Sequence, residues 1–220
     1  MSSTSAESDS LSLRQQAIVP VAANAASGDI VKLDAALSQA LDAGLTVSDL
    51  REILVQVYAY AGFPRSLNAL GALMRVLESR RQRGIQDAIG QAPVRPIPTG
   101  AALLTAGTAN QTKLSGGAVK GPVLDFAPAI DEYLKTHLFG DIFERDNLDW
   151  QSREFATLSM LSVLPGVEAQ LQAHMRISMN VGCSASQLRQ IGQVLADRVD
   201  AGAAQRAHEA LERQLATLSG

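Results

Sequence analysis

The sequence has little of several features that mark common classes of protein. It contains one cysteine, Cys183, which excludes an internal disulfide and a cysteine-based zinc site. The net charge is −3 and no segment is rich in lysine or arginine, so the basic surface that nucleic acid requires is missing. No apolar run approaches the roughly 20 residues of a membrane-spanning helix, and residues 1–10 do not resemble a signal peptide. We therefore expect a cytoplasmic protein with a disordered N-terminus (residues 1–10), without a cofactor, and with neither nucleic acid nor membrane as a partner.

Aromatic residues are also scarce, at 4% of the chain, although 46% of the residues are hydrophobic. The core must therefore consist mostly of alanine, leucine, valine and isoleucine. Because strands favour aromatic and β-branched residues, this composition favours close-packed helices. Leu50, Ile53, Leu54 and Val57 follow the i, i+3, i+4, i+7 spacing of one apolar helix face. We predict an all-α fold.

Proline and glycine divide this helical pattern into units. The stretch from about residue 84 to residue 122 holds four of the eight prolines and seven of the 17 glycines. We interpret residues 84–125 as an ordered linker between two helical units, which span residues 11–83 and 126–220. Within the first unit, Gly62-Phe63-Pro64 ends one helix, and Pro64 can open the next.

The two units are diverged copies of each other. A shift of 138 residues superimposes seven identities: Leu33, Ala35, Gly44, Ser48, Leu50, Arg51 and Ile53 fall on Leu171, Ala173, Gly182, Ser186, Leu188, Arg189 and Ile191. Both copies also start a helix with a hydroxyl cap after a glycine, at Gly44-Leu45-Thr46 and at Gly182-Cys183-Ser184. Such matches fix turn chemistry rather than composition, so they indicate a true repeat.

The copies differ at their polar positions. The second copy has Glu154 and His174 where the first has Gln15 and Ala36. The first copy has Tyr60-Ala61-Gly62-Phe63-Pro64, and the second has no such turn. We therefore predict one composite site to which both copies contribute.

These motifs resemble the carboxymuconolactone decarboxylase family, whose unit reads roughly Arg-Glu, Gln-Leu-x-x-His, Gly-x-Thr and Tyr-x-Gly-Phe-Pro. The second copy matches with Arg153-Glu154, with the run from Gln170 to His174 and with Gly182-Cys183-Ser184, and the first copy matches with Gly44-Leu45-Thr46 and the run from Tyr60 to Leu70. The resemblance implies the helical fold of alkylhydroperoxidase D and its relatives. It also implies a homo-oligomer, in which a two-copy chain could form a trimer that mimics a hexameric ring.

The resemblance implies three alternatives for function. The first is a lyase that decarboxylates a small anionic lactone or related carboxylate, with His174 and Glu154 as acid and base. Arg153 or Arg65 would bind the anion, and Gln170 and Tyr60 would contact it. The second is a peroxidase-like protein that uses Cys183 alone, because the family's Cys-x-x-Cys-x-x-x-His pattern has Val167 and Gln170 at its cysteine positions here. The third is a non-catalytic ligand-binding or assembly protein.

Each candidate residue also has a purely structural interpretation. His174 shares a helical stripe with Leu171 and Met175 and could be a core histidine. Arg153-Glu154 could be a solvated pair near a helix start. The turn from Tyr60 to Pro64 could serve packing alone, and Cys183 could be a small buried hydrophobe. The geometry around His174 separates these interpretations.

Overall fold

The structure, a computed structural model, describes residues 9–218, so residues 1–8 of the predicted disordered N-terminus lie outside it. Over the described residues the chain forms eleven α-helices and one π-helix, with no strand, which confirms the all-α prediction. The elements are α2 (Leu13–Ser27), α3 (Ile30–Asp42), α4 (Val47–Gln56), α5 (Tyr58–Gln82), α6 (Ala101–Ser115), α7 (Pro122–Phe126), α8 (Pro128–Tyr133), η1 (Leu134–Ile142), α9 (Trp150–Val163), α10 (Glu168–Asn180), α11 (Ala185–Arg198) and α12 (Ala201–Leu218). None of the helices formed by these residues is long and apolar enough to cross a membrane.

The repeat is visible in the helix order and in the caps. Helices α2 to α5 correspond to α9 to α12, and the starts of α3 and α4 lie 138 residues before those of α10 and α11. Thr46 and Ser184 each form a capping box, with Asp49 and Gln187 respectively at the third helical position. The same local chemistry therefore starts the third helix of both copies.

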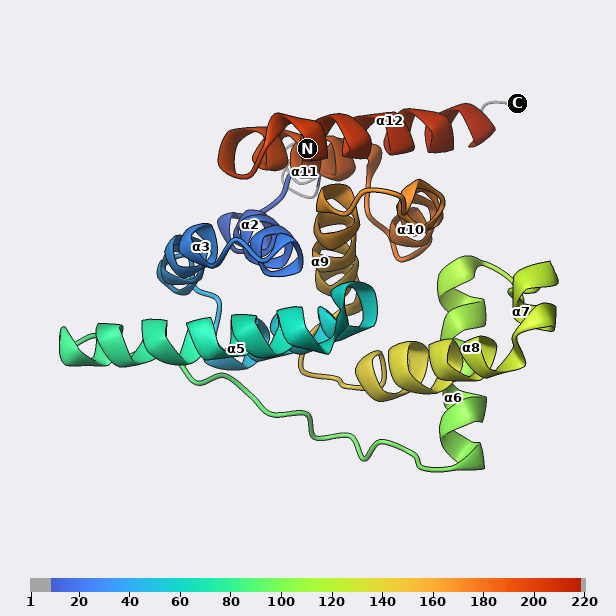
Figure 1. Cartoon of the computed structure of the whole chain (residues 1–220), viewed down its shortest axis with the longest axis horizontal. Coiled ribbons are helices and arrows are strands. Elements are labelled where there is room, and N and C mark those ends of the chain that lie inside the picture. The colour runs from blue at the N-terminus through green and yellow to red at the C-terminus, as the bar shows by residue number, and fades with distance from the viewer. Residues whose placement is uncertain (1–8, 219–220) are drawn as a thin grey trace, which may run out of the picture.

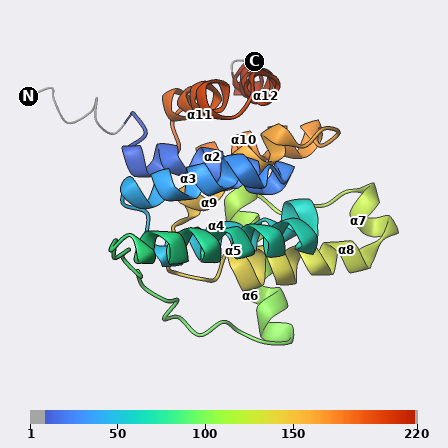
Figure 2. The same ribbon diagram turned by 60° about the vertical axis from the view of Figure 1, so that its left-hand side comes forward.

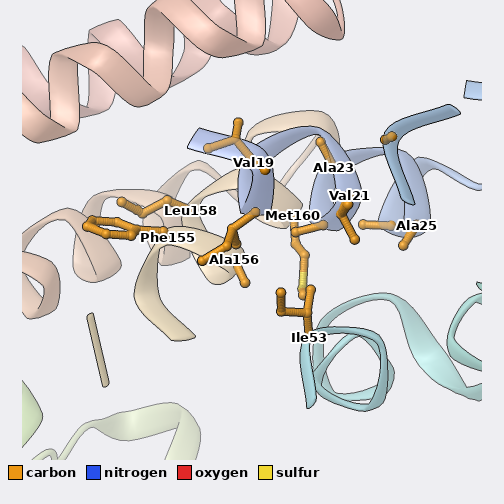
Figure 3. Close-up of a cluster of buried hydrophobic side chains, with 14 of the residues drawn as sticks. Val19, Val21, Ala23, Ala25, Ile53, Phe155, Ala156, Leu158 and Met160 are labelled. Carbon is orange, nitrogen blue, oxygen red and sulfur yellow. The ribbon is translucent and has the colours of Figure 1, made fainter. Parts of the chain in front are cut away.

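The two copies share one core, whose centre is the contact between α2 and α9 (Figure 3). Val21 of α2 lies beside Met160 of α9, and Ile53 of α4 lies just below Met160 in this view. Alanines fill much of the α2 surface, so the two helix axes can lie close together without large side chains between them. The scarcity of aromatic residues thus reflects a core of closely packed helices.

Side chains at equivalent positions of the two copies, Glu52 in α4 and Gln190 in α11, form hydrogen bonds to the other copy. The Glu52 carboxylate accepts hydrogen bonds from Arg145, which precedes α9, and from Arg153 within it. Gln190 bonds the segment that precedes α2, through the backbone of Leu11 and Asp9. Each copy therefore secures the entry to the other copy's first helix, but only the first copy does so with a buried charge.

The segment between the copies contains more helix than its proline and glycine content predicts. Residues 84–100 run extended along the surface, where the carbonyls of Ala88 and Ile89 accept hydrogen bonds from the first backbone N–H groups of α4. The chain then forms α6, returns through α7, α8 and η1, and enters α9. Helices α6 and η1 form a separate lobe below α10 (Figures 1 and 2).

Close contact between α6 and η1 depends on glycine. A Cβ atom on Gly107 would lie 1.7 Å from the carbonyl oxygen of Lys135, so no larger residue fits there without moving the backbone. Asn110 of α6 fixes the crossing, because its amide donates to the carbonyl of Phe139 at 2.9 Å and to Glu144 at 2.6 Å. The lobe is thus a defined part of the fold and forms one side of the site described next.

Candidate functional site

A cavity of about 370 Å³ lies between the α6–η1 lobe and helix α10. Most of its lining is apolar, with a few polar groups among it, as is typical of small-molecule sites. Helices α5, α6, η1, α9 and α10 all contribute. The lining residues are Ala59, Tyr60, Gln111, Ser115, Val119, Leu134, Leu138, Phe139, Leu161, Val167, Gln170, Ala173, His174, Arg176 and Ile177.

His174 and Glu154 form a hydrogen-bonded pair at this cavity. Glu154 Oε2 lies 2.8 Å from His174 Nδ1, and the Glu154 side chain is fully buried. The imidazole is 10% exposed and lines the cavity, and its Nε2 atom has no hydrogen-bond partner among residues 9–218. When the neutral ring donates from Nδ1 to the carboxylate, Nε2 therefore presents a lone pair.

The tight turn between α9 and α10 produces this pairing. Leu164-Pro165-Gly166 ends α9, with Gly166 in a left-handed conformation (φ 81°), and α10 then runs back along α9. Ser178, one helical turn after His174, donates to the carbonyl of His174 and lies 3.5 Å from Glu154 Oε2. The carboxylate is thus enclosed between two helices, and its direct contact with the imidazole holds the ring in place.

Tyr60 of the first copy completes this part of the cavity. Its ring meets His174 edge-on, with centroids 5.7 Å apart and an angle of 78°, and its hydroxyl lies 3.3 Å from Thr157 Oγ1. Burial, together with the negative charge of Glu154, raises the pKa of Tyr60, so it stays a neutral phenol. Gly62 allows this placement because its φ of 82° and ψ of 161° break the helix directly after the Tyr60 turn. The two copies therefore do meet at one cavity.

Arg153 does not line the cavity. Its side chain is fully buried, and its guanidinium donates to Glu52 Oε2 at 3.0 Å and to the carbonyl of Arg145 at 3.1 Å. Although burial raises the pKa of Glu52, hydrogen bonds from both arginines bring it below its usual value, so the carboxylate stays charged. The guanidinium predicted to bind substrate is here held in a buried ion pair between the two copies.

Of the remaining predicted site residues, one lines the cavity and two lie elsewhere. Gln170 is exposed and lines the cavity, whereas Arg65 is exposed elsewhere, with its guanidinium over the backbone of Gly28. Cys183 is 4% exposed within the main hydrophobic core. Burial raises the pKa of its thiol to about 12, with a smaller effect from Glu154 and Asp149, so almost no thiolate exists near neutral pH.

Two cavity residues were missed by sequence reasoning. Arg176 is exposed, lies two positions after His174, and forms no ion pair within the described part of the chain. The stripe of α10 residues 167, 170, 173, 174 and 177 has helical spacing, and following it from His174 would have drawn attention to its charged neighbour. Gln111 lies within residues 84–125, where the run from Asn110 to Leu114 resembles two-copy members of the family but was assigned no role in the site.

Comparison with known proteins follows the repeat. The sequence model of the carboxymuconolactone decarboxylase family matches residues 2–74 and 128–213, which together are well over half of the chain and fall in both copies. The chain belongs to the carboxymuconolactone decarboxylase family. A search of curated proteins found no match to it.

In this carboxymuconolactone decarboxylase family member, the two positions that correspond to the dithiol cysteines of the peroxidase branch also line the cavity. Val167 and Gln170, which stand at the cysteine positions of that pattern, both line the wall beside His174. The cavity wall therefore has a valine and a glutamine side chain at the two positions where the peroxidase branch has cysteines. No three His, Cys, Asp or Glu side chains gather into a potential metal site within residues 9–218.

Proposed function

We propose that this protein is a carbon–carbon lyase that decarboxylates a small anionic lactone or a related carboxylate, with His174 as the acid/base group. The observation that carries the proposal is the state of the imidazole. One ring nitrogen is bonded to a buried carboxylate, and the other has no partner and lies at the wall of an apolar cavity. A histidine placed only for packing would also need a partner for its ring N–H, but it would not need an unpaired ring nitrogen beside a cavity.

The proposed reaction needs one proton donor. When the bond between the ring carbon and the carboxylate breaks, carbon dioxide leaves and the electron pair passes into the conjugated lactone carbonyl. A proton from His174 Nε2 then adds to the resulting carbanionic carbon. Glu154 Oε2, 2.8 Å from Nδ1, holds the ring in one orientation, and a positioned general acid typically contributes 10²–10⁴-fold to a rate.

The anion needs a cation, and Arg176 is the best placed. Its guanidinium borders the cavity without an ion pair to any described residue, so it can bind a carboxylate in a bidentate manner. Arg153 supports the site differently, by holding α9 against α4. We therefore propose Arg176, in place of Arg153 or Arg65, as the substrate's carboxylate partner.

The peroxidase alternative has less support. It requires a reactive thiolate, and Cys183 is buried in the core with a raised pKa and does not line the cavity. A ligand-binding protein without catalysis would need the cavity but not the Glu154–His174 pair. The pair therefore favours the lyase.

The test is turnover of carboxymuconolactone, measured as release of carbon dioxide. We expect His174→Ala to lower kcat by about 10²–10⁴-fold, because the proton donor is lost. Glu154→Gln should also lower kcat, because an amide does not hold the imidazole in the same way as the carboxylate that contacts Nδ1. His208→Ala is the matched control, since His208 is exposed on α12 and does not line the cavity. Wild-type turnover by His174→Ala, or no turnover by the wild type, would refute the proposal.

The homo-oligomer and the cytoplasmic location stay predictions from the sequence. Support for self-association comes from α5, where Phe63, Leu67 and Met74 are 64%, 64% and 72% exposed. Exposed apolar side chains clustered on one helix are common at protein interfaces. Light scattering should give three times the chain mass if the predicted trimer forms.

A further inference from the structure

Gln111 is a buried polar side chain without a partner. It is 4% exposed, it lines the cavity that contains His174, and its amide makes no hydrogen bond with any described residue. Its neighbours on α6 differ: Asn110 bonds η1, and Thr108 and Thr112 bond the backbone of their own helix. Neither atom of the Gln111 amide is among the fully buried side-chain atoms that lack a partner, so the amide still reaches the space beside it and is available there to a ligand.

The position of this amide is fixed by the residues around it. Leu114, three positions later, is fully buried, and its carbonyl accepts a hydrogen bond from Asn180 of α10 at 2.9 Å. On the other side, Asn110 bonds Phe139 and Glu144. Helix α6 is thus tied both to η1 and to the helix that carries His174. A group held in this way loses little freedom when it binds a ligand.

The α6 wall lies outside the part of the chain that the family model matches. The family model matches residues 2–74 and 128–213, so Gln111, Ser115 and Val119 all lie outside the matched segments. The residues of the acid/base pair lie inside them. The repeat thus contributes His174 and Glu154 to the cavity, and the segment between the copies contributes the wall that carries Gln111.

From these observations we infer that Gln111 determines substrate specificity, by hydrogen bonding a neutral oxygen of the ligand while Arg176 holds its carboxylate. The ligand class is a small carboxylate that also carries an ester or ketone oxygen. The inference rests on the proposed function for the identity of the site. It adds a residue that acts on binding and selectivity, and assigns Gln111 no part in proton transfer.

A neighbouring hollow gives the alternative role for this side chain. Gln111 and Val119 also border a second cavity of about 410 Å³, which Lys120 and Lys135 line as well. If the amide served only to separate the two hollows, its loss would alter both ligand affinity and stability without regard to ligand chemistry. The experiment must therefore compare ligands that differ only in the neutral oxygens.

Two probes make that comparison with the full chain. 5-Oxotetrahydrofuran-2-carboxylate carries a carboxylate and a lactone, and cyclopentanecarboxylate carries only the carboxylate on a ring of the same size. Isothermal titration calorimetry would measure both with the wild type, with Gln111→Leu and with Gln172→Leu. Gln172 is the control, because it lies on α10 near His174, is half-buried and does not line the cavity.

We expect the wild type and Gln172→Leu to prefer the lactone, and Gln111→Leu to lose about tenfold of that preference while binding cyclopentanecarboxylate as before. Gln111→Leu should also melt at or above the wild-type temperature, because it removes an unpaired buried amide. Equal loss of both probes, or a lower melting temperature, would assign Gln111 a structural role and overturn the inference.

The result also separates this inference from the proposed function. A lactone preference that survives in Gln111→Leu refutes the role of Gln111 and leaves the lyase proposal standing. Failure of both probes to bind the wild type refutes both, because the site would then not recognise small carboxylates. Loss of the preference in Gln111→Leu together with wild-type turnover by His174→Ala would keep the binding role and remove the lyase mechanism.

Discussion

Replacing Arg153 tests whether this residue serves the fold or the substrate. Its side chain is fully buried, and it donates to Glu52, to the carbonyl of Arg145 and, at 3.4 Å, to Gln56. Methionine would fill much of the same volume but make none of these hydrogen bonds. The Glu52 carboxylate would lose one of its two cations and would stay buried, at 4% exposure of its side chain.

The size of the effect follows from what Glu52 keeps. Removing one partner of a buried ion pair costs about 3–5 kcal/mol. Arg145 still grips both carboxylate oxygens of Glu52, at 2.8 to 3.0 Å, so we expect the lower end, about 3 kcal/mol. For a chain of this size that corresponds to a fall in melting temperature of roughly 6–12 °C.

Urea unfolding followed by helical circular dichroism would measure the change in stability, and turnover at saturating substrate would measure the change in activity. Arg176→Met is the matched control: it should stay within about 0.5 kcal/mol of the wild type, because it is exposed and unpaired, but raise KM. The double variant Arg153→Met/Glu52→Gln should recover part of the loss, since it no longer buries an underpaired carboxylate. Wild-type stability of Arg153→Met, with turnover lost, would show that Arg153 acts on the substrate and that our assignment is wrong.

Three further predictions concern the thiol, pH and backbone. Cys183, whose pKa burial raises to about 12, should react with a thiol reagent at pH 8 only after denaturation, and rapid labelling of the native protein would contradict this. The pKa of Glu52 in the folded protein lies below its usual value of 4.5, so the stability that this carboxylate contributes is complete above pH 4.5 and is lost as the pH falls through the lower folded pKa. The difference in urea midpoint between the wild type and Glu52→Gln should therefore shrink below about pH 4.5. A difference that stays constant down to pH 3 would refute this prediction. Gly62→Ala should cost about 1–3 kcal/mol, because alanine is strained at φ 82°, while Gly71→Ala, at a helical glycine of the same element whose Cβ would meet nothing closer than 3.8 Å, should be neutral or stabilising in the same melting experiment.

The sequence predicted those features that depend on local chemistry. Capping residues and glycines identified the start of the third helix in both copies, because a cap works through atoms three residues apart. The approach of His174 to Glu154 was foreseeable for the same reason, since a tight turn joins their two helices. A site shared by both copies was also predictable, because the turn that contains Tyr60 occurs only in the first copy and the histidine and glutamate occur only in the second.

Features that depend on distant contacts were not predictable. Arg153 looked like a substrate residue because its partner Glu52 lies 101 positions away in sequence. Helix α6 was hidden by Gly107 and by three threonines, which are poor helix formers. Packing against η1 overrides that propensity, and Gly107 is required at the crossing with Lys135. Gly107 thus lowers the intrinsic stability of α6 but permits the close contact with η1 that stabilises this helix in the folded protein.

The two copies pack differently around the position of His174. In the first copy, Ala36 stands at the position of His174 and is buried at 5% exposure in the main core. Helix α10 packs on α9 and α12 as α3 packs on α2 and α5, but α10 alone also contacts α6. The inserted lobe thus encloses space over one copy only, and there the acid/base pair is kept. The lobe that carries Gln111 and the helices that carry His174 and Glu154 thus come from different segments of the chain, so the inferred specificity and the proposed chemistry can be altered by separate substitutions.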